Sequence, residues 1–351
     1  MKETLSAKLD IKNLSFEELN DFLKNLNQTL YRTIQIFRWL YLKGVYDFYE
    51  MTDLSNPLRE ALYNKFFIYK AEILEKQLSR DGTIKFLLRL NDKGLIECVL
   101  IRQKDRNTLC ISTQIGCRFK CSFCASSLRG FIRDLKCSEI LEQYLIVKND
   151  LGTERINNIV FMGMGEPLDN IENLIKAIRI LNSKYGQNIG IRKITISTCG
   201  LVRGIKKLIA SGIAPELSIS LNAPEDEIRN RLMPINRRFN IKELLKIAEE
   251  YTQNTKRLIT FEYILIKGVN DLPAYARRLS SLLKGLKCKL NLIIYNKVGA
   301  LAYEGSNAAR IKYFYNILKN NKIPVTLRHS RGEDIDAACG QLVLRFSDGT
   351  L

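Results

Sequence analysis

LCISTQIGCRFKCSFC, residues 109–124, begins the part of the chain that decides the fold. An apolar run typical of a β-strand leads directly into a loop in which Cys117, Cys121 and Cys124 are spaced C-x3-C-x2-C. From this loop onward, short apolar runs alternate with amphipathic stretches of helical period. Such alternation predicts an α/β fold with a parallel sheet, and about six repeats indicate a partial (βα)6 barrel.

Six further apolar runs are expected to form strands of this barrel, with helices between them. The runs are residues 158–162, 193–197, 217–221, 259–266, 290–295 and 325–328, and helices are indicated at 138–147, 170–181, 241–251 and 272–283. Because the carboxyl ends of the strands meet at one face of such a barrel, we expect the functional residues to cluster there.

Three segments flank the barrel core, which is expected at residues 103–335. Residues 1–70 contain amphipathic runs at 16–23, 33–42 and 57–66, which predict a small helical N-terminal accessory domain. Its sole tryptophan, Trp39, is expected to anchor the core of that domain. Residues 71–102 alternate apolar and polar positions around two turn sequences, which indicates a β-hairpin connector. Residues 336–351 are expected to form a C-terminal loop or tail.

The charge of the chain favours a polyanionic partner. Its 351 residues include 55 Lys and Arg against 37 Asp and Glu, a formal net charge of +18 that is spread along the whole sequence. Lysine and arginine contacts to phosphates are strongly favourable because they release counterions. A basic but merely solvated surface is the alternative. No apolar stretch is long enough to cross a bilayer and no export signal begins the chain, so a cytoplasmic protein is expected.

The nine cysteines are an odd number in a chain without a secretion signal, so we interpret the cluster as a metal site. Three thiolates on one loop can hold three irons of a [4Fe-4S] cluster, which leaves the fourth iron open. The amino and carboxylate groups of S-adenosylmethionine (SAM) can bind there. The alternative is structural zinc, which requires four ligands; Cys137 could supply the fourth, whereas the sole His329 is distant in sequence.

Five motifs in order resemble the RlmN/Cfr family of radical SAM enzymes, which methylate an adenine in RNA. They are STQIGCRFKCSFC at 112–124, RGFIRDL at 129–135, FMGMGEPLDN at 161–170, SISLNAPEDEIRNRLMPIN at 218–236 and RGEDIDAACGQL at 331–342. The resemblance extends over essentially the whole chain. It implies a cluster on Cys117, Cys121 and Cys124, an RNA-binding N-terminal domain and an external electron donor such as flavodoxin.

The resemblance also implies the RNA substrates. These are 23S rRNA near the peptidyl-transferase centre and tRNA at the adenosine 3′ of the anticodon, each converted to 2-methyladenosine by a monomeric enzyme. Pro167 and the RGFIRDL motif favour this carbon-2 branch of the family over the branch that methylates carbon 8. The SAM contacts implied by similarity are Gly165, Glu166, Ser197, Ser220, Leu221, Asn222 and Asn296. Most of these residues end an expected strand.

Three residues are implied to carry the chemistry. Cys339 matches the family's methyl carrier, which one SAM methylates and a radical from a second SAM then activates for attack on the adenine. Cys110 matches the thiol that releases the resulting protein–RNA adduct by forming a transient disulfide, and Glu97 matches the acid/base glutamate. Without the resemblance, Cys110 would be interpreted as an apolar strand residue and Glu97 as a solvated carboxylate. Cys98, Cys137, Cys199 and Cys288 are expected to serve packing.

The chain departs from the family pattern at three places. Asn222 stands in SLNA where SLHA is usual, Cys199 stands in STCG where STSG is common, and the loop after Asn296 lacks the usual prolines. The alternatives to a carbon-2 methyltransferase are therefore a carbon-8 enzyme, a degenerate enzyme and a zinc-stabilised RNA-binding protein without catalytic activity.

Overall fold

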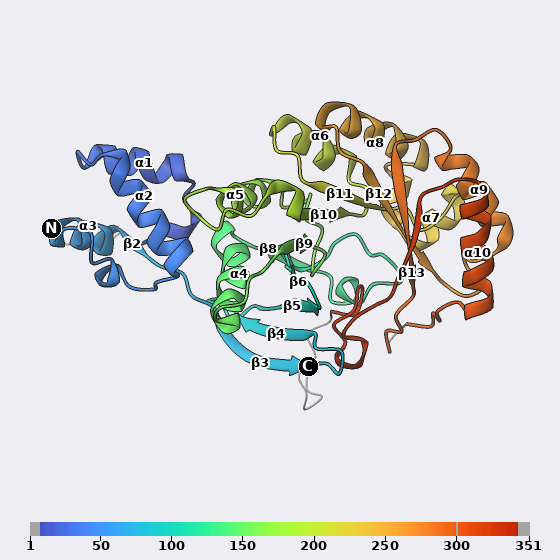
Figure 1. The fold of residues 1–351 in the computed structure, drawn as a ribbon, viewed down its shortest axis with the longest axis horizontal. Coiled ribbons are helices and arrows are strands. Elements are labelled where there is room, and N and C mark those ends of the chain that lie inside the picture. Colours follow the sequence, from blue (N-terminus) through green and yellow to red (C-terminus); the bar gives the residue numbers. More distant parts are fainter. Residues whose placement is uncertain (1–7, 300, 343–351) are drawn as a thin grey trace.

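The computed structural model describes residues 8–299 and 301–342, and a ten-stranded sheet forms its centre (Figure 1). The strand order is β14-β13-β12-β11-β10-β9-β6-β5-β4-β3. Seven of these strands run parallel: β6 (Arg106–Cys110), β9 (Asn158–Phe161), β10 (Ile194–Thr198), β11 (Glu216–Ser220), β12 (Ile259–Leu265), β13 (Cys288–Ile294) and β14 (Val325–Arg328).

Helices follow the parallel strands and cover one face of the sheet. They are α4 (Cys137–Leu151), α5 (Ile171–Asn182), α6 (Val202–Ala210), α7 (Asp226–Leu232), α8 (Ile241–Thr255), α9 (Pro273–Leu283) and α10 (Ala308–Asn320). The ends of the sheet are β14 and β3, so the barrel is open. The predicted α/β class with a partial barrel of six strand–helix units is confirmed.

The strands of this open barrel have two chemically different faces. On β10 and β11 the outward side chains, such as Ile196 and Ile219, are fully buried beneath the helices. The alternate positions point inward, and the backbone register places Ser197 beside Ser218 and Ser220 beside Glu262. On these strands the helices therefore cover an apolar face, whereas the inner face is polar.

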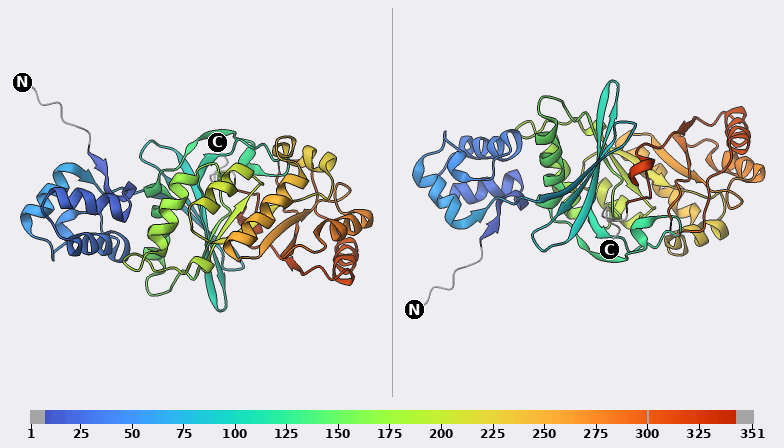
Figure 2. Two further views of the ribbon diagram at one scale, coloured as in Figure 1. Left: turned by 90° about the horizontal axis from the view of Figure 1, so that it is seen from above. Right: turned by 90° about the horizontal axis from the view of Figure 1, so that it is seen from below.

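Three antiparallel strands extend the sheet beyond β6. They are β3 (Glu72–Leu78), β4 (Ile84–Arg89) and β5 (Leu95–Gln103), joined by the predicted turns at Asp81-Gly82 and 92–94. Figure 2 shows them crossing the middle of the molecule, between the N-terminal helices and the carboxyl half of the sheet. The β-hairpin connector expected from the sequence is thus part of the main sheet.

The N-terminal helices α1 (Phe16–Asn25), α2 (Leu30–Arg38) and α3 (Asn56–Lys65) form a separate small layer at one end of the molecule (Figures 1 and 2). Helix α2 continues as a π-helical turn, Trp39–Lys43, which ends at Gly44 with φ of 72°. Trp39 is buried as expected, and its ring nitrogen donates to Asp53 at 2.5 Å. No helix of the described residues is long and apolar enough to cross a membrane.

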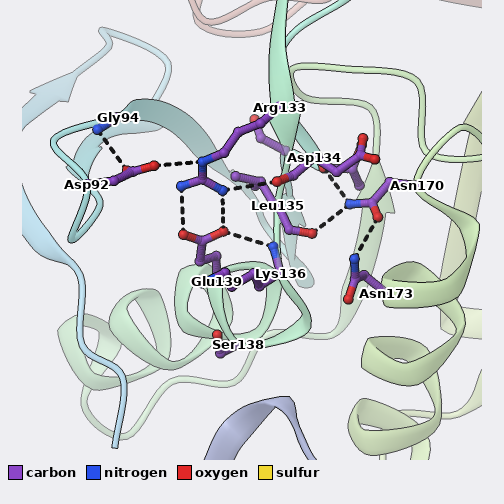
Figure 3. Close-up of polar contacts among 12 residues, drawn as sticks. Asp92, Gly94, Arg133, Asp134, Leu135, Lys136, Ser138, Glu139, Asn170 and Asn173 are labelled. Carbon is purple, nitrogen blue, oxygen red and sulfur yellow. Dashed lines mark hydrogen bonds and ion pairs between the residues drawn. The ribbon is translucent and has the colours of Figure 1, made fainter. Parts of the chain in front are cut away.

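The short strand β8 (Phe131–Asp134) is held firmly against the rest of the core (Figure 3). Its Arg133 makes a bidentate contact with Glu139 at 2.7 and 2.8 Å and also donates to Asp92 at 2.7 Å. These contacts join β8 to the first turn of α4 and to the β4–β5 turn. Since β8 pairs with β7 (Gln114–Gly116), they also fix the base of the cysteine loop between these two strands.

A buried ion pair attaches the N-terminal helices to the core. The Lys12 ammonium donates to Glu142 of α4 at 2.7 Å and to the Tyr69 carbonyl at 2.9 Å, and both charged side chains are fully buried. Tyr46 donates to the same carboxylate at 2.8 Å. Because neither charge is solvated, each depends on the other for compensation.

Replacing one partner of this pair should destabilise the protein more than replacing both. We expect Lys12→Met to lower the free energy of unfolding by roughly 3–5 kcal/mol, since it leaves the Glu142 carboxylate uncompensated, and Lys12→Met with Glu142→Leu to recover part of the loss. Chemical denaturation measures both. Lys24→Met, which removes the exposed Lys24–Asp21 pair, is the control and should change little. Equal stability of Lys12→Met and wild type would contradict the assignment.

Candidate functional site

The cysteine loop, residues 117–124, lies between β7 and the short 3-10 turn Ala125–Ser127. It begins at Gly116, which has φ of 73° and whose Cβ, if present, would lie 1.7 Å from the Gly130 carbonyl oxygen. The backbone N–H of Cys117 donates to that same oxygen at 3.0 Å. The Ser127 hydroxyl lies 2.7 and 2.6 Å from the carbonyl oxygens of Cys121 and Cys124. The loop is therefore fixed at both ends.

The three thiols of this loop interact electrostatically with one another. Burial raises the pKa of Cys121 well above its ordinary value, and the thiols of Cys124 and Cys117 raise it further. Burial likewise raises the pKa of Cys117 to about 12. A positively charged iron centre among the sulfurs would reverse this effect and favour the thiolates. The donor chemistry therefore fits a cluster.

The described residues contain no group of three or more His, Cys, Asp or Glu side chains that could hold a single metal ion. A [4Fe-4S] cluster requires a different geometry, since each thiolate binds its own iron. The three half-buried thiols on one loop meet that requirement.

The GMGEP turn follows β9 and lies against the strand that leads into the cysteine loop. A Cβ on Gly163 would lie 2.6 Å from the Ser112 hydroxyl, and one on Gly165, which has φ of 98°, would lie 2.5 Å from Gln114 Cβ. The backbone N–H of Glu166 donates to the Gln114 side chain at 2.8 Å. Only glycine fits these two positions, which explains the glycine-rich sequence.

The Glu166 carboxylate is buried and holds the backbone directly after the neighbouring strand, β10. It accepts backbone N–H groups of Leu168 at 3.1 Å and Cys199 at 2.7 Å. Burial raises the pKa of Glu166, while the hydrogen bond from Cys199 lowers it. The side chains of Thr198 and Cys199 also hydrogen-bond this carboxylate, and a contact with the SAM ammonium remains a prediction. The backbone role, in contrast, could not be read from the sequence.

The predicted residues on β10 and β11 lie side by side. Ser197 and Ser220 are half-buried on the inner face near the carboxyl ends of these strands. Leu221 and Asn222, which follow β11, are fully buried. Because β10 and β11 are neighbours, the structure brings together the residues from the ISTCG and SLNA motifs that the sequence places 23 positions apart, Ser197 and Ser220.

The segment that carries Cys339 is hydrogen-bonded to the residues directly after the cysteine loop. The Ala125 N–H donates to the Gly340 carbonyl at 2.8 Å, and the Ser126 hydroxyl donates to the Leu342 carbonyl at 3.0 Å. Asn296, after β13, donates to the Cys339 carbonyl at 3.1 Å. Residues 125–126, 296 and 339–342 thus form one hydrogen-bonded unit, although residues 343–351 of the predicted tail lie outside the described part of the chain.

Cys339 and Cys110 meet in a cavity of about 410 Å³ at the inner face of the sheet. Cys339 is open to solvent on the cavity side, whereas Cys110 at the end of β6 is buried. Burial and the neighbouring Cys339 thiol raise the pKa of Cys110 to about 12. Burial raises the pKa of Cys339 as well, although Arg328 opposes the shift. All nine cysteines are free thiols, so both are available in the resting protein.

Two residues of this cavity were not expected from the sequence. Arg328 and His329 line it at the end of β14, and His329, set apart from the cysteines by sequence distance, lies on the same cavity as Cys339. Their position at the carboxyl end of the expected strand 325–328 was the available signal, because functional residues in such barrels lie at the strand ends. A third unexpected residue is Glu262 on β12, whose buried carboxylate accepts from Asn291 at 3.0 Å.

Glu97 lies on β5, on the same face as Val99, the residue that pairs with Cys110. Its side chain is fully buried and one carboxylate oxygen lies 3.2 Å from the Lys85 ammonium. The alternative interpretation of Glu97 as a solvated carboxylate is therefore wrong. Glu97 belongs to the same inner face as the cavity, although it does not line it.

Comparisons with known proteins agree with this architecture. Residues 111–275 match the model of the radical SAM superfamily, and residues 9–68 match that of the ribosomal RNA large subunit methyltransferase N-terminal domain. A protein of Lachnoclostridium phytofermentans named "Probable dual-specificity RNA methyltransferase RlmN" is 43% identical over 99% of this chain and 98% of its own length. One of the same name from Caldanaerobacter subterraneus is 45% identical over 96% of this chain and 98% of its own.

The chain belongs to the RlmN family. Among solved structures, a radical SAM methyltransferase from Sphaerobacter thermophilus matches with a TM-score of 0.90 and 40% identity, covering 95% of this chain and 99% of that one. The similarity therefore includes the N-terminal helices, the connector strands and the open barrel. The zinc-protein alternative is set aside, since membership of the radical SAM superfamily implies an iron–sulfur cluster.

The structure explains why asparagine can replace the usual histidine of the RlmN family at position 222. Asn222 has φ of 57°, in the left-handed region where asparagine and histidine are both enriched among non-glycine residues. Its side-chain oxygen accepts the Ile264 N–H at 2.9 Å, and its backbone carbonyl accepts from Asn270 at 2.8 Å. Asn222 thus connects the end of β11 to β12, and its side chain is directed into the protein.

Substitutions at position 222 should separate the contributions of the backbone conformation and of the side chain to the free energy of unfolding. We expect Asn222→Ala to lower the free energy of unfolding by about 1–3 kcal/mol, because the buried Ile264 N–H loses its acceptor and alanine disfavours positive φ. Asn222→Gly should lose less, because glycine tolerates the backbone conformation. Chemical denaturation of the two variants checks the order. An alanine variant as stable as the wild type would show that this bond contributes nothing.

Proposed function

We propose that this protein is a radical SAM RNA methyltransferase that forms 2-methyladenosine in 23S rRNA and in tRNA. The observation that carries the proposal is the shared cavity of Cys110 and Cys339, lined by a segment that is hydrogen-bonded to the two residues directly after the cysteine loop. A packing role for these two thiols would not require an open cavity between strand ends. The proposal includes the dual specificity that the names of the relatives state for those proteins.

Cys117, Cys121 and Cys124 would hold the cluster, and the turns after β9, β10, β11 and β13 would bind SAM through Gly165, Glu166, Ser197, Ser220, Leu221, Asn222 and Asn296. When bound, these groups supply an electron, a methyl group and a carbon-centred radical. Radical chemistry suits the adenine carbon 2, because this electron-poor C–H centre does not attack an electrophilic methyl group.

The residues of the cavity have distinct tasks in this proposal. Cys339 accepts and carries the methyl carbon, and its exposure on the cavity side gives an RNA base access to its sulfur. Cys110 attacks the Cys339 sulfur when the product leaves, so that the two thiols end as a disulfide that an external reductant must open. Glu97 on the same face takes part in the proton transfer at carbon 2. Its buried position beside Lys85 would keep the carboxylate oriented.

The N-terminal helices and the net charge of +18 would bind the folded RNA. An adenine in a single-stranded element can be turned out of its stack to reach the cavity, at a cost of a few kcal/mol. The enzyme would act in the cytoplasm as a monomer with an external electron donor such as flavodoxin.

The methylated carbon distinguishes this function from its nearest rival. Anaerobically reconstituted protein, incubated with unmethylated 23S rRNA or tRNA, SAM and a reductant, should produce 2-methyladenosine, detected by mass spectrometry of the nucleosides. A Cys339→Ala variant should produce none, because Cys110, the second thiol that lines this cavity, is buried and does not replace the exposed methyl carrier. Formation of 8-methyladenosine instead would overturn the choice of the carbon-2 branch.

The role of Cys110 can be tested by trapping the adduct. In Cys110→Ala the protein–RNA bond has no thiol to release it, so we expect at most about one RNA per chain to react and to remain attached. Denaturing gels with labelled RNA measure the adduct. Cys288→Ala, which changes a buried cysteine on β13 outside the cavity, is the matched control and should turn over normally. Repeated turnover by Cys110→Ala would remove its proposed role.

A further inference from the structure

A buried arginine lies behind the proposed SAM site. Arg229 of α7 is fully buried, and its guanidinium donates to four oxygens. Nε donates to the Leu221 carbonyl at 3.0 Å, Nη1 to Asn236 Oδ1 at 2.8 Å, and Nη2 to the carbonyls of Cys199 at 2.8 Å and Ser220 at 3.0 Å. All four acceptors are uncharged. Burying a cation with only neutral hydrogen-bond partners costs free energy, because the charge loses its solvation. We therefore expect the charge of Arg229 to have a function.

The Arg229 guanidinium lies near the cysteine loop. Burial lowers its pKa, whereas the thiols of Cys199 and Cys121 and the Asp226 carboxylate oppose that shift. Asp226 is exposed and reaches the guanidinium only through Asn236, which donates to it at 2.8 Å. The Cys199 thiol, in contrast, is buried, and the Cys121 thiol is half-buried. An anion placed at those thiols would be the natural countercharge.

Helix α7 also contacts the loop directly. The backbone N–H of Ser122, between two of the loop cysteines, donates to the carbonyl of Leu232 at 2.9 Å. Leu232 is the last residue of α7, and the Met233 N–H donates back to the Arg229 carbonyl at 2.7 Å. The helix that carries the guanidinium is therefore bonded to the loop that would hold the cluster.

The carbonyls that Arg229 holds belong to two neighbouring turns. Cys199 follows β10, whereas Ser220 and Leu221 lie at the end of β11. A single planar guanidinium thus fixes the spacing of both strand ends. Lysine could not reproduce this, because it presents a point charge without the fork geometry of the guanidinium.

We propose that Arg229 is a positioning residue with two effects: it sets the spacing of the β10 and β11 ends for SAM, and its buried charge raises the reduction potential of the neighbouring cluster. The inference rests on the proposed function. A cluster held by thiolates carries negative charge, and one-electron reduction adds to it. A fixed cation in a medium of low dielectric constant stabilises the reduced form more than the oxidised form.

The test is an anaerobic redox titration of reconstituted protein, followed by electron paramagnetic resonance of the reduced cluster. In Arg229→Gln we expect the ratio of reduced to oxidised cluster at a fixed potential to fall about tenfold, equivalent to about 59 mV for a one-electron couple. Arg231→Gln removes the same charge from an exposed position on the same helix and should not change the ratio. Arg229→Lys should keep the potential near that of the wild type but weaken SAM binding, measured as the SAM-induced change in the spectrum.

A second pair of variants leaves Arg229 intact, in case its replacement prevents folding. Asp226→Asn removes the carboxylate that interacts with Arg229 and should increase the reduced fraction of the cluster. Glu227→Gln, an equal change of charge at the adjacent exposed position, should not.

A cluster in Arg229→Gln that titrates like the wild type would overturn the role of the charge. If Arg229→Gln does not fold, equal reduction potentials of the cluster in Asp226→Asn and Glu227→Gln would overturn the role of the charge. Unchanged SAM binding by Arg229→Lys would overturn the positioning role. Failure of the wild type to assemble any cluster would instead reject the proposed function.

Discussion

The polar inner face of strands β10 to β13 is the constraint on which the rest of the structure depends. Helices cover the outer face, so the hydroxyl, amide and carboxylate groups on the inner face must find partners within the protein or from a ligand. Several find them in one another, as Glu262 and Asn291 do across β12 and β13. The loops after the strands complete the inner face, which explains why the cysteine loop, the GMGEP turn and the Cys339 segment all converge there.

The convergence is achieved by hydrogen bonds to main-chain carbonyls more than by pairs of side chains. Gly340 and Leu342 bond to the residues that follow the last loop cysteine, and Asn296 holds the Cys339 carbonyl. A thiol more than 200 positions away in the sequence is thereby placed beside Cys110. The same bonds make the end of the chain part of the site, so a movement of the Cys339 segment would also move the cysteine loop.

The order of strands and helices could be predicted from the sequence because each element has a clear apolar period. The predicted strand 325–328 coincides with β14, and the predicted helix 272–283 differs from α9 by one residue. The site was only partly predictable. Local motifs mark the cysteine loop and the GMGEP turn, whereas the positions of His329, Arg328 and Glu262 on the inner side depend on how the sheet curves. No local pattern distinguishes the buried Arg229 from the exposed Arg231, since only the direction of each side chain from α7 separates them.

The departures from the RlmN pattern lie at positions where main-chain groups make most of the hydrogen bonds. Asn222 satisfies a left-handed conformation and caps a neighbouring strand, which requires a polar side chain but no imidazole. At Cys199 the N–H and carbonyl groups bond to Glu166 and Arg229, and the thiol also hydrogen-bonds the Glu166 carboxylate, a contact that a serine hydroxyl could make as well. A site built from main-chain groups tolerates such exchanges. Glu166 and Arg229 cannot vary in the same way, because one carboxylate and one guanidinium hold both sides of a single peptide segment.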